Sequence, residues 1–411
     1  MTTVSERARQ WMMDVGETVI EQSSSGTLTL APEVIRRAAS VYTDPDLFAR
    51  ESNRLFRRLP LMLAASCEIR DPGDFRTFDI AGVPILLTRD NAGRARAMVN
   101  ICTHRGSPVA AGRGKTKRLS CPYHGWTFGL DGQLLAVASP ADFGVIDRDA
   151  HTLAPLPLLE KGGMIWVIPD PGSSVDIEGF LGTFGDALCG FDLGNWTLVS
   201  ERHLPGANWK LAFDAHLEFY HLPVLHRDTF GPTISNQALY FYEGPHERLI
   251  RPARYKKSGM PDDAELLSWQ GRPSDQWPLE TLMQGEWILF PNVSLNTFYD
   301  GGRGLFVSRV YPGAKVGESV TVQSYYLQGN PDEAAKAKAC ERADFLEHVV
   351  ADEDLANSFR QQRAMDSGLL REVTYGRNEG GIPRFHDWVD RILATPDDAL
   401  NSLFQEGRWS V

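Results

Sequence analysis

The fold of this chain is decided between residues 100 and 126, where the sequence reads Asn100-Ile101-Cys102-Thr103-His104-Arg105-Gly106 and then, after a connecting segment, Cys121-Pro122-Tyr123-His124-Gly125-Trp126. Each stretch offers one thiol and one imidazole, Cys102 with His104 and Cys121 with His124. The connecting segment is long enough for a strand, a turn and a strand. A hairpin of that kind brings both loops to the same end, so we expect two thiolates and two imidazoles to converge.

This set of donors suits a metal, and two kinds of metal site are possible. A structural zinc site also takes two Cys and two His, but the usual zinc finger has both Cys on one knuckle and both His on a helix. Here each loop supplies one of each, which suits a Rieske [2Fe–2S] cluster with two Cys on one iron and two His on the other. With 5 Cys and 10 His in 411 residues, the expected number of accidental matches to this spacing in the whole chain is on the order of 10⁻⁵. The cluster is the favoured interpretation and zinc the alternative.

The two loops resemble the Rieske motif of the ring-hydroxylating non-haem iron oxygenases, in their catalytic α subunit. Rieske ferredoxins carry the same loops, so the motif alone does not separate an enzyme from an electron carrier. The rest of the chain has to decide between them.

The composition limits the partners and the location of the protein. The formal net charge is −11, which argues against binding to nucleic acid or to an anionic membrane. No run of about eighteen apolar residues exists, so no membrane span is expected, and the polar start of the chain lacks an apolar signal core. Cys67, Cys189 and Cys340 show no framework spacing and are interpreted as reduced thiols. These features predict a cytoplasmic protein.

Hydrophobic periodicity divides the chain into three regions: helices in residues 1–59, short strands in residues 60–172, and mixed helices and strands in residues 173–411. The family resemblance implies that these are N-terminal helices packing with the catalytic domain, an all-β Rieske [2Fe–2S] domain and a catalytic mononuclear iron domain. The fold class is therefore α+β, with an antiparallel sheet covered by helices in the catalytic domain. The expected elements are helices at 1–22, 45–57, 208–222 and 332–365 and strands at 78–88, 127–134, 163–168, 288–298, 305–311 and 320–327.

A second candidate metal site lies in the helix predicted at 208–222. Glu218 and His221 are three residues apart and would share a helix face. Pro223 would end the regular helix, so that the chain can bring His226 beside His221. Two imidazoles at this spacing suit a divalent metal, and one carboxylate would complete the facial triad of a non-haem iron(II) oxygenase. Two His five residues apart are common, so by themselves they leave a purely structural role open.

The sequence around these residues extends the family resemblance. Asn208-Trp209-Lys210, followed by Glu218-Phe219-Tyr220-His221 and His226, is similar to the family's iron motif. Asp214-Ala215 departs from the Glu-Asn that the family often has, and Glu218 replaces the Asp of many members. Glutamate at that position is more similar to the carnitine and glycine-betaine oxygenases. His216 is interpreted as structural.

The third iron ligand is expected in the long helical region, where Val349 to Leu355 resembles the family's Glu-Asp pair. Asp354 is the predicted ligand and Asp352 the second choice, and a solvated acidic helix face is the alternative. The resemblance also implies a head-to-tail homotrimer. Glu218 is then expected to hold the Nδ1–H of His221 with one oxygen and His124 of the partner subunit with the other, as a bridge for electrons rather than a ligand.

The resemblance implies a terminal oxygenase whose cofactors are a Rieske [2Fe–2S] cluster and one mononuclear Fe(II). The chain shows no Gly-rich dinucleotide fingerprint, so electrons are expected from a separate NAD(P)H-dependent reductase, with or without a ferredoxin. O₂ would supply oxygen to a small organic substrate, by monooxygenation, by dioxygenation in aromatic ring hydroxylation, or by oxidative demethylation. The alternative function is a non-catalytic Rieske electron carrier, which needs only residues 60–172.

Overall fold

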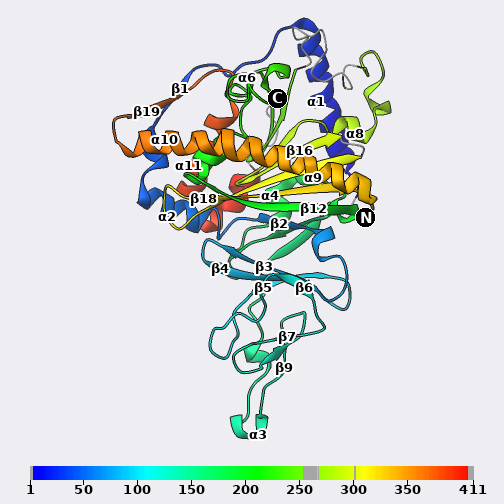
Figure 1. Ribbon diagram of the computed structural model, residues 1–411, viewed down its shortest axis with the longest axis vertical. Helices are drawn as coiled ribbons and strands as arrows, with labels where there is room; N and C mark the ends of the chain where they lie inside the picture. The colour runs from blue at the N-terminus through cyan, green and yellow to red at the C-terminus, as the bar shows by residue number, and fades with distance from the viewer. Residues whose placement is uncertain (1–2, 253–265, 267, 300–301, 406–411) are drawn as a thin grey trace.

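The computed structural model describes residues 3–252, 266, 268–299 and 302–405. The molecule is elongated, with a broad part built on a large sheet and a narrower β part that tapers to the helix α3 (Pro140–Phe143) at the bottom of Figure 1. None of the described helices is long and apolar enough to cross a membrane. The model combines antiparallel sheets with helices, which confirms the α+β fold class.

The narrower part is built from three antiparallel sheets. Their strand orders are β5-β4-β3-β6, β7-β8-β9 and β10-β11-β2. The strands are β2 (Leu61–Ala65), β3 (Asp74–Ile80), β4 (Val83–Arg89), β5 (Ala95–Val99), β6 (Arg113–Lys115), β7 (Leu119–Ser120), β8 (Thr127–Phe128), β9 (Leu134–Ala136), β10 (Leu158–Lys161) and β11 (Met164–Val167). The predicted strand pair at 78–88 is present as β3 and β4, and the predicted hairpin at 127–134 as β8 and β9.

The N-terminal helices pack on the broad part, because α1 (Glu6–Ser25) contacts α4 (Ile177–Leu188) and α2 (Pro45–Arg54) contacts α11 (Gly381–Ala394). Asp44 caps α2, since its carboxylate accepts the backbone N–H groups of Asp46 at 2.8 Å and Leu47 at 3.1 Å. Pro45 occupies the first turn, where its missing N–H removes no hydrogen bond.

The broad part holds an antiparallel sheet of seven strands in the order β12-β18-β17-β16-β15-β14-β13. These are β12 (Trp196–Gly206), β13 (Leu239–Glu243), β14 (His246–Ile250), β15 (Glu286–Leu289), β16 (Val293–Tyr299), β17 (Arg303–Pro312) and β18 (Ser319–Gln328). The long helices α9 (Glu333–His348) and α10 (Ala356–Asp366) run across this sheet in orange (Figure 1). The remaining elements are α5 (Trp209–Asp214), α6 (Leu222–Leu225), α8 (Leu279–Leu282), α12 (Leu400–Gln405) and the pair β1 (Ile35–Ala38) with β19 (Glu372–Tyr375).

Two element predictions were wrong in part. The strand expected at 288–298 is two strands, β15 and β16, because Pro291 has no N–H to donate to a ladder and interrupts the run. The helix expected at 208–222 ends at Asp214, and Pro223 lies in the first turn of the next helix, α6, instead of ending the first. Between the two helices, the carboxylate of Glu218 accepts the backbone N–H groups of Tyr220 and His221, so these donors are not available to a helix that continues past Asp214.

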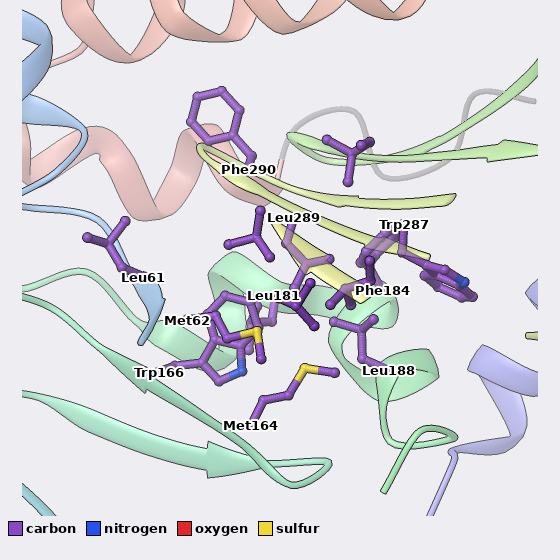
Figure 2. Close-up of a cluster of buried hydrophobic side chains, with 14 of the residues drawn as sticks. Leu61, Met62, Met164, Trp166, Leu181, Phe184, Leu188, Trp287, Leu289 and Phe290 are labelled. Carbon is purple, nitrogen blue, oxygen red and sulfur yellow. The ribbon is translucent and has the colours of Figure 1, made fainter. Parts of the chain in front are cut away.

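The two parts share one continuous core. Figure 2 shows Leu61, Met62, Met164 and Trp166 of the narrower part packed against Leu181 and Phe184 of α4, with Trp287 and Leu289 of β15 on the other side. The labelled side chains are all buried to within a few per cent of their surface. Side chains packed this closely hold the two parts in a fixed relation, since core packing tolerates little displacement.

Candidate functional site

Two loops at the narrow end, 102–106 and 121–125, are each closed by a turn of the same kind. Gly106 N–H donates to the carbonyl of Cys102 at 2.9 Å, and Gly125 N–H donates to the carbonyl of Cys121 at 3.0 Å. Both glycines have positive φ, 84° and 69°, a conformation that other residues rarely adopt. Each loop therefore wraps around its cysteine and presents the histidine that follows.

The four predicted cluster residues converge. The thiols of Cys102 and Cys121 are buried, with residue exposures of 2% and 4%, whereas His104 and His124 are half-buried. The two imidazole centroids lie 4.7 Å apart, and Trp126 stacks on His104 at 4.8 Å. Nδ1 of His124 is buried without a hydrogen-bond partner among the described residues. Two inner thiols and two outer imidazoles fit a Rieske cluster, and the orphaned nitrogen fits a metal ligand.

The second site surrounds the short helix α6. His221 precedes its first residue and His226 follows its last, so one helical turn separates them and their ring centroids lie 5.2 Å apart. The two imidazoles therefore lie close together, as expected. They are brought together by the short helix α6 and not by the end of one long helix.

Asp354 faces both imidazoles. Its Oδ1 lies 3.6 Å from Nε2 of His221 and 3.4 Å from Nε2 of His226, and one ligand atom from each residue lies within 4.8 Å of the others. Oδ1 is buried and has no hydrogen-bond partner among the described residues. Ligand atoms at about 2 Å from one metal lie roughly 3 Å from one another. The three ligand atoms here are slightly farther apart, so a small inward shift of the side chains would let them bind one divalent ion.

Asp354 belongs to a π-helical segment, Val349–Leu355, inserted between α9 and α10. Such segments are frequent at functional sites, because the extra residue per turn redirects side chains. The second-choice ligand, Asp352, points away and pairs with His348 at 2.7 Å on the surface. This geometry supports Asp354 over Asp352.

Sequence reasoning missed Glu353. Its Oε2 lies 2.6 Å from Nδ1 of His226 and also accepts the hydroxyl of Thr229 at 3.1 Å. A ligating histidine needs a partner for its second nitrogen, and this rule could have directed attention to the acid beside Asp354.

Glu218 holds the other imidazole. One oxygen contacts Nδ1 of His221, and the other accepts the N–H groups of Tyr220 and His221. Only 6% of Glu218 is exposed, so it is not an ordinary surface carboxylate. Burial disfavours the charged imidazole of His221, but the carboxylates around it, Glu218 first and then Asp354 and Glu286, together raise the pKa of His221 above its ordinary value. Nε2 of His221 is left to face Asp354.

The three candidate ligands lie between two cavities. One, of about 240 Å³, meets His221, His226 and Asp354 and has an aromatic wall built by Phe219, Phe230, Phe298, Phe306 and Phe345. The other, of about 510 Å³, meets Glu218, His221 and Asp354 and has the polar side chains of Tyr42, Tyr375 and Glu379 in its wall. A substrate fits the first cavity, and the second gives access to Glu218.

A buried polar network, which the sequence did not indicate, supports the wall of the second cavity. The hydroxyl of Tyr42 contacts the carboxylate of Asp214 and lies 2.6 Å from the hydroxyl of Tyr375. Nε2 of His386 lies 3.1 Å from the same carboxylate. Asp214, one of the departures from the family pattern, therefore ties the end of α5 to the N-terminal and C-terminal segments.

Comparisons with known proteins identify the domains that contain these residues. Residues 60–147 match the model of the Rieske [2Fe–2S] domain, and residues 193–395 match the ring hydroxylating alpha subunit (catalytic domain). The glycine betaine monooxygenase oxygenase subunit of Chromohalobacter salexigens is 34% identical over 395 residues, covering 88% of this chain and 87% of that protein. Choline monooxygenase of Spinacia oleracea is 31% identical, covering 86% and 77%.

Solved structures share the fold. A quaternary ammonium Rieske monooxygenase in complex with L-carnitine aligns with a TM-score of 0.71 at 20% identity, covering 86% of this chain and 94% of that one. Naphthalene 1,2-dioxygenase from Rhodococcus sp. aligns with a TM-score of 0.71 at 20% identity, covering 96% and 100%. At this identity the likeness concerns the fold alone.

Proposed function

Because this chain belongs to the family of Rieske ring-hydroxylating oxygenases, as a catalytic α subunit, we propose the roles of its individual residues and the class of its reaction. The protein is a terminal oxygenase that takes electrons from a separate reductase and inserts oxygen from O₂ into a small organic substrate. Its cofactors are a Rieske [2Fe–2S] cluster and a mononuclear iron. A carrier of electrons alone would not contain the catalytic domain matched at 193–395.

Cys102 and Cys121 are the proposed ligands of one cluster iron, and His104 and His124 of the other. His221, His226 and Asp354 are the proposed ligands of the mononuclear iron. When bound, the two groups supply one-electron transfer and the activation of O₂, respectively. The observation that carries the second assignment is the triangle of ligand atoms within 4.8 Å at the wall of the aromatic cavity.

The surrounding residues prepare the ligands. Glu218 and Glu353 hold the Nδ1 positions of His221 and His226, so both rings present Nε2 toward Asp354. The phenyl rings of the cavity wall exclude water from the space where a substrate binds. A substrate in this cavity would lie beside the triad, because His221, His226 and Asp354 form part of the same wall.

Electron transfer is proposed to cross between subunits of a head-to-tail homotrimer. Figure 1 places α6 near the top of the molecule and β7 and β9 near the opposite end of its longest axis, so one chain keeps its two candidate metal sites apart. Glu218 lines the second cavity, which shares His221 and Asp354 with the aromatic cavity. We assign this cavity to His124 of the partner subunit, with Glu218 as the bridge between the two imidazoles.

The proposed reaction is monooxygenation at an N-methyl carbon of a quaternary ammonium compound, followed by loss of formaldehyde. The names of the relatives support the quaternary ammonium substrate, since they are a glycine betaine monooxygenase and a choline monooxygenase. Dioxygenation of an aromatic ring has less support, because the likeness to naphthalene 1,2-dioxygenase concerns the fold alone. The NAD(P)H dependence of the reductase, a ferredoxin, the cytoplasmic location and the domain limits 1–59, 60–172 and 173–411 stay predictions.

A mixed oligomer tests the crossing of electrons between subunits. Cys102→Ala removes a cluster ligand and His221→Ala an iron ligand, so each variant alone should be inactive. The two variants, co-expressed with different affinity tags and purified through both, should recover part of the wild-type formaldehyde release from glycine betaine with a reductase present. If mixed oligomers are as inactive as each variant, electrons do not cross between subunits.

A further inference from the structure

A histidine and a glutamate form a pair in the wall of the aromatic cavity. Nδ1 of His216 lies 3.3 Å from Oε1 of Glu286, and both side chains line the cavity that His221, His226 and Asp354 also meet. Only 16% of the His216 side chain and 8% of the Glu286 side chain are exposed. Neither residue is a proposed iron ligand or holds the Nδ1 position of one, so the function proposed above leaves the pair without a role.

The pair is fixed from both sides. His216, interpreted from the sequence as structural, follows α5 by two residues, and its backbone N–H donates to the carbonyl of Phe213 at 2.9 Å. Its ring packs against the ring of Phe213, with centroids 5.7 Å apart. Glu286 is the first residue of β15, and its Oε1 also accepts the hydroxyl of Ser294, on the neighbouring strand β16, at 2.6 Å. Two segments far apart in the sequence thus hold the acid against the imidazole.

This arrangement is that of a base and the carboxylate that orients it. A carboxylate that accepts the Nδ1–H of a histidine leaves a lone pair on Nε2, and it stabilises the imidazolium that forms when Nε2 takes up a proton. Within the described part of the chain, Nε2 of His216 has no hydrogen-bond partner, so it is available to a ligand in the cavity. Such hydrogen bonds are often long in the absence of a ligand, which accounts for the 3.3 Å.

The proposed reaction needs a base at this place. Hydroxylation of an N-methyl carbon leaves an N-hydroxymethyl ammonium ion, R₃N⁺–CH₂OH, beside the triad. This ion releases formaldehyde when its hydroxyl loses a proton. The O–H electron pair then forms the C=O bond, the C–N bond breaks, and its electron pair returns to the nitrogen of a neutral tertiary amine. A cavity walled by five phenylalanine rings supplies little water to take that proton.

We propose that Nε2 of His216 accepts the hydroxyl proton of this ion, and that Glu286 positions His216 and stabilises its imidazolium. The proton then leaves toward a third cavity, of about 670 Å³, because Glu286 and Asn296 belong to the walls of both cavities. The third cavity reaches the surface at Tyr299, which is 81% exposed. The inference rests on the function proposed above, since it concerns the hydroxylated product in the same cavity.

The step is measurable without oxygenation. The ion expected from glycine betaine, HOCH₂–N⁺(CH₃)₂–CH₂–COO⁻, is kept in acid, where its hydroxyl stays protonated. It is then mixed rapidly into buffer that contains oxidised holoenzyme and no reductase, and formaldehyde is followed over time. A general base contributes about 10²–10⁴-fold, so saturated wild-type enzyme should release formaldehyde on the order of a hundredfold or more faster than buffer alone.

Variants separate the base from the residue that positions it. His216→Ala should lose the acceleration, and added imidazole should restore part of it. His216→Phe fills the same space with a ring, so imidazole should not restore the acceleration there. Glu286→Gln can still accept from Ser294 but lacks the charge, so it should lower kcat on the order of ten- to a hundredfold and leave KM within about twofold. Iron content and the Rieske signal should equal those of wild type in every variant.

His203 supplies the matched control. It also lies beside a carboxylate, with its Nε2 3.6 Å from Oε1 of Glu201, but its side chain is 61% exposed. It lines neither the aromatic cavity nor the third cavity. His203→Ala should therefore release formaldehyde at the wild-type rate.

Three outcomes overturn the proposal: no acceleration by wild-type enzyme, equal acceleration by wild type and His216→Phe, or a loss in Glu286→Gln that lies in KM alone. These results differ from failure of the proposed function. Enzyme that breaks down the hydroxymethyl ion but consumes no glycine betaine with reductase and O₂ would refute the reaction and leave the base in place. Oxygenation without accelerated breakdown would refute only the base.

Discussion

Removing Glu353 should weaken iron binding without touching a proposed iron ligand. The side chain of His226 is 1% exposed, and its Nδ1 lies 2.6 Å from Oε2 of Glu353. A hydrogen bond to a charged group in such surroundings contributes about 1.5–3 kcal/mol. At about 1.4 kcal/mol for each tenfold change, Glu353→Ala should bind iron about ten to a hundred times more weakly.

The neighbouring acid supplies a matched control. Asp352 lies in the same π-helical segment, but its side chain is 68% exposed and contacts only His348. Asp352→Ala should therefore bind iron within about twofold of wild type. Iron-loaded variants would be titrated with a chelator of known affinity, and the cluster signal in electron paramagnetic resonance would report an intact narrower part. Equal iron affinity in Glu353→Ala and wild type would refute the role given to Glu353.

Other predictions concern the cluster, the bridge and pH. Cys102→Ala or His124→Ala should abolish the Rieske signal in electron paramagnetic resonance, and an unchanged signal would remove the residue from the cluster. Glu218→Ala should bind iron more weakly, as Glu353→Ala does, and when loaded with excess iron and chemically reduced it should hold its cluster reduced in the presence of substrate and O₂. Near-normal turnover of the iron-loaded variant would contradict the bridge. Because Glu218 raises the pKa of His221, protons should compete with iron from above pH 6.5 downward, and Glu218→Gln should move the midpoint of iron release to lower pH. An unmoved midpoint would contradict that coupling.

The proposed ligands could be located in the sequence because short motifs contain them. Cys102 with His104 and Cys121 with His124 lie in local turns whose glycines are visible in the sequence. His221 and His226 also stand close together, and the acid-rich stretch near residue 354 narrows the third ligand to a few candidates.

Apart from Glu218, the residues around the proposed ligands were not predictable in the same way. Glu353 reaches His226 only because a π-helical segment turns it there, and no residue pattern announced that segment. Glu286 comes to the cavity through strand pairing far along the chain. The helix expected at 208–222 was wrong because the Glu218 side chain competes for backbone donors, a local contact that hydrophobic periodicity does not register.

An iron count tests the two-site assignment most directly. Purified wild-type protein should contain about three irons per chain, two in the cluster and one at the triad. Asp354→Ala and His226→Ala should each contain about two, with the Rieske signal unchanged and no oxygenation. Three irons in Asp354→Ala, or a loss of iron in Asp352→Ala instead, would contradict the site formed by His221, His226 and Asp354.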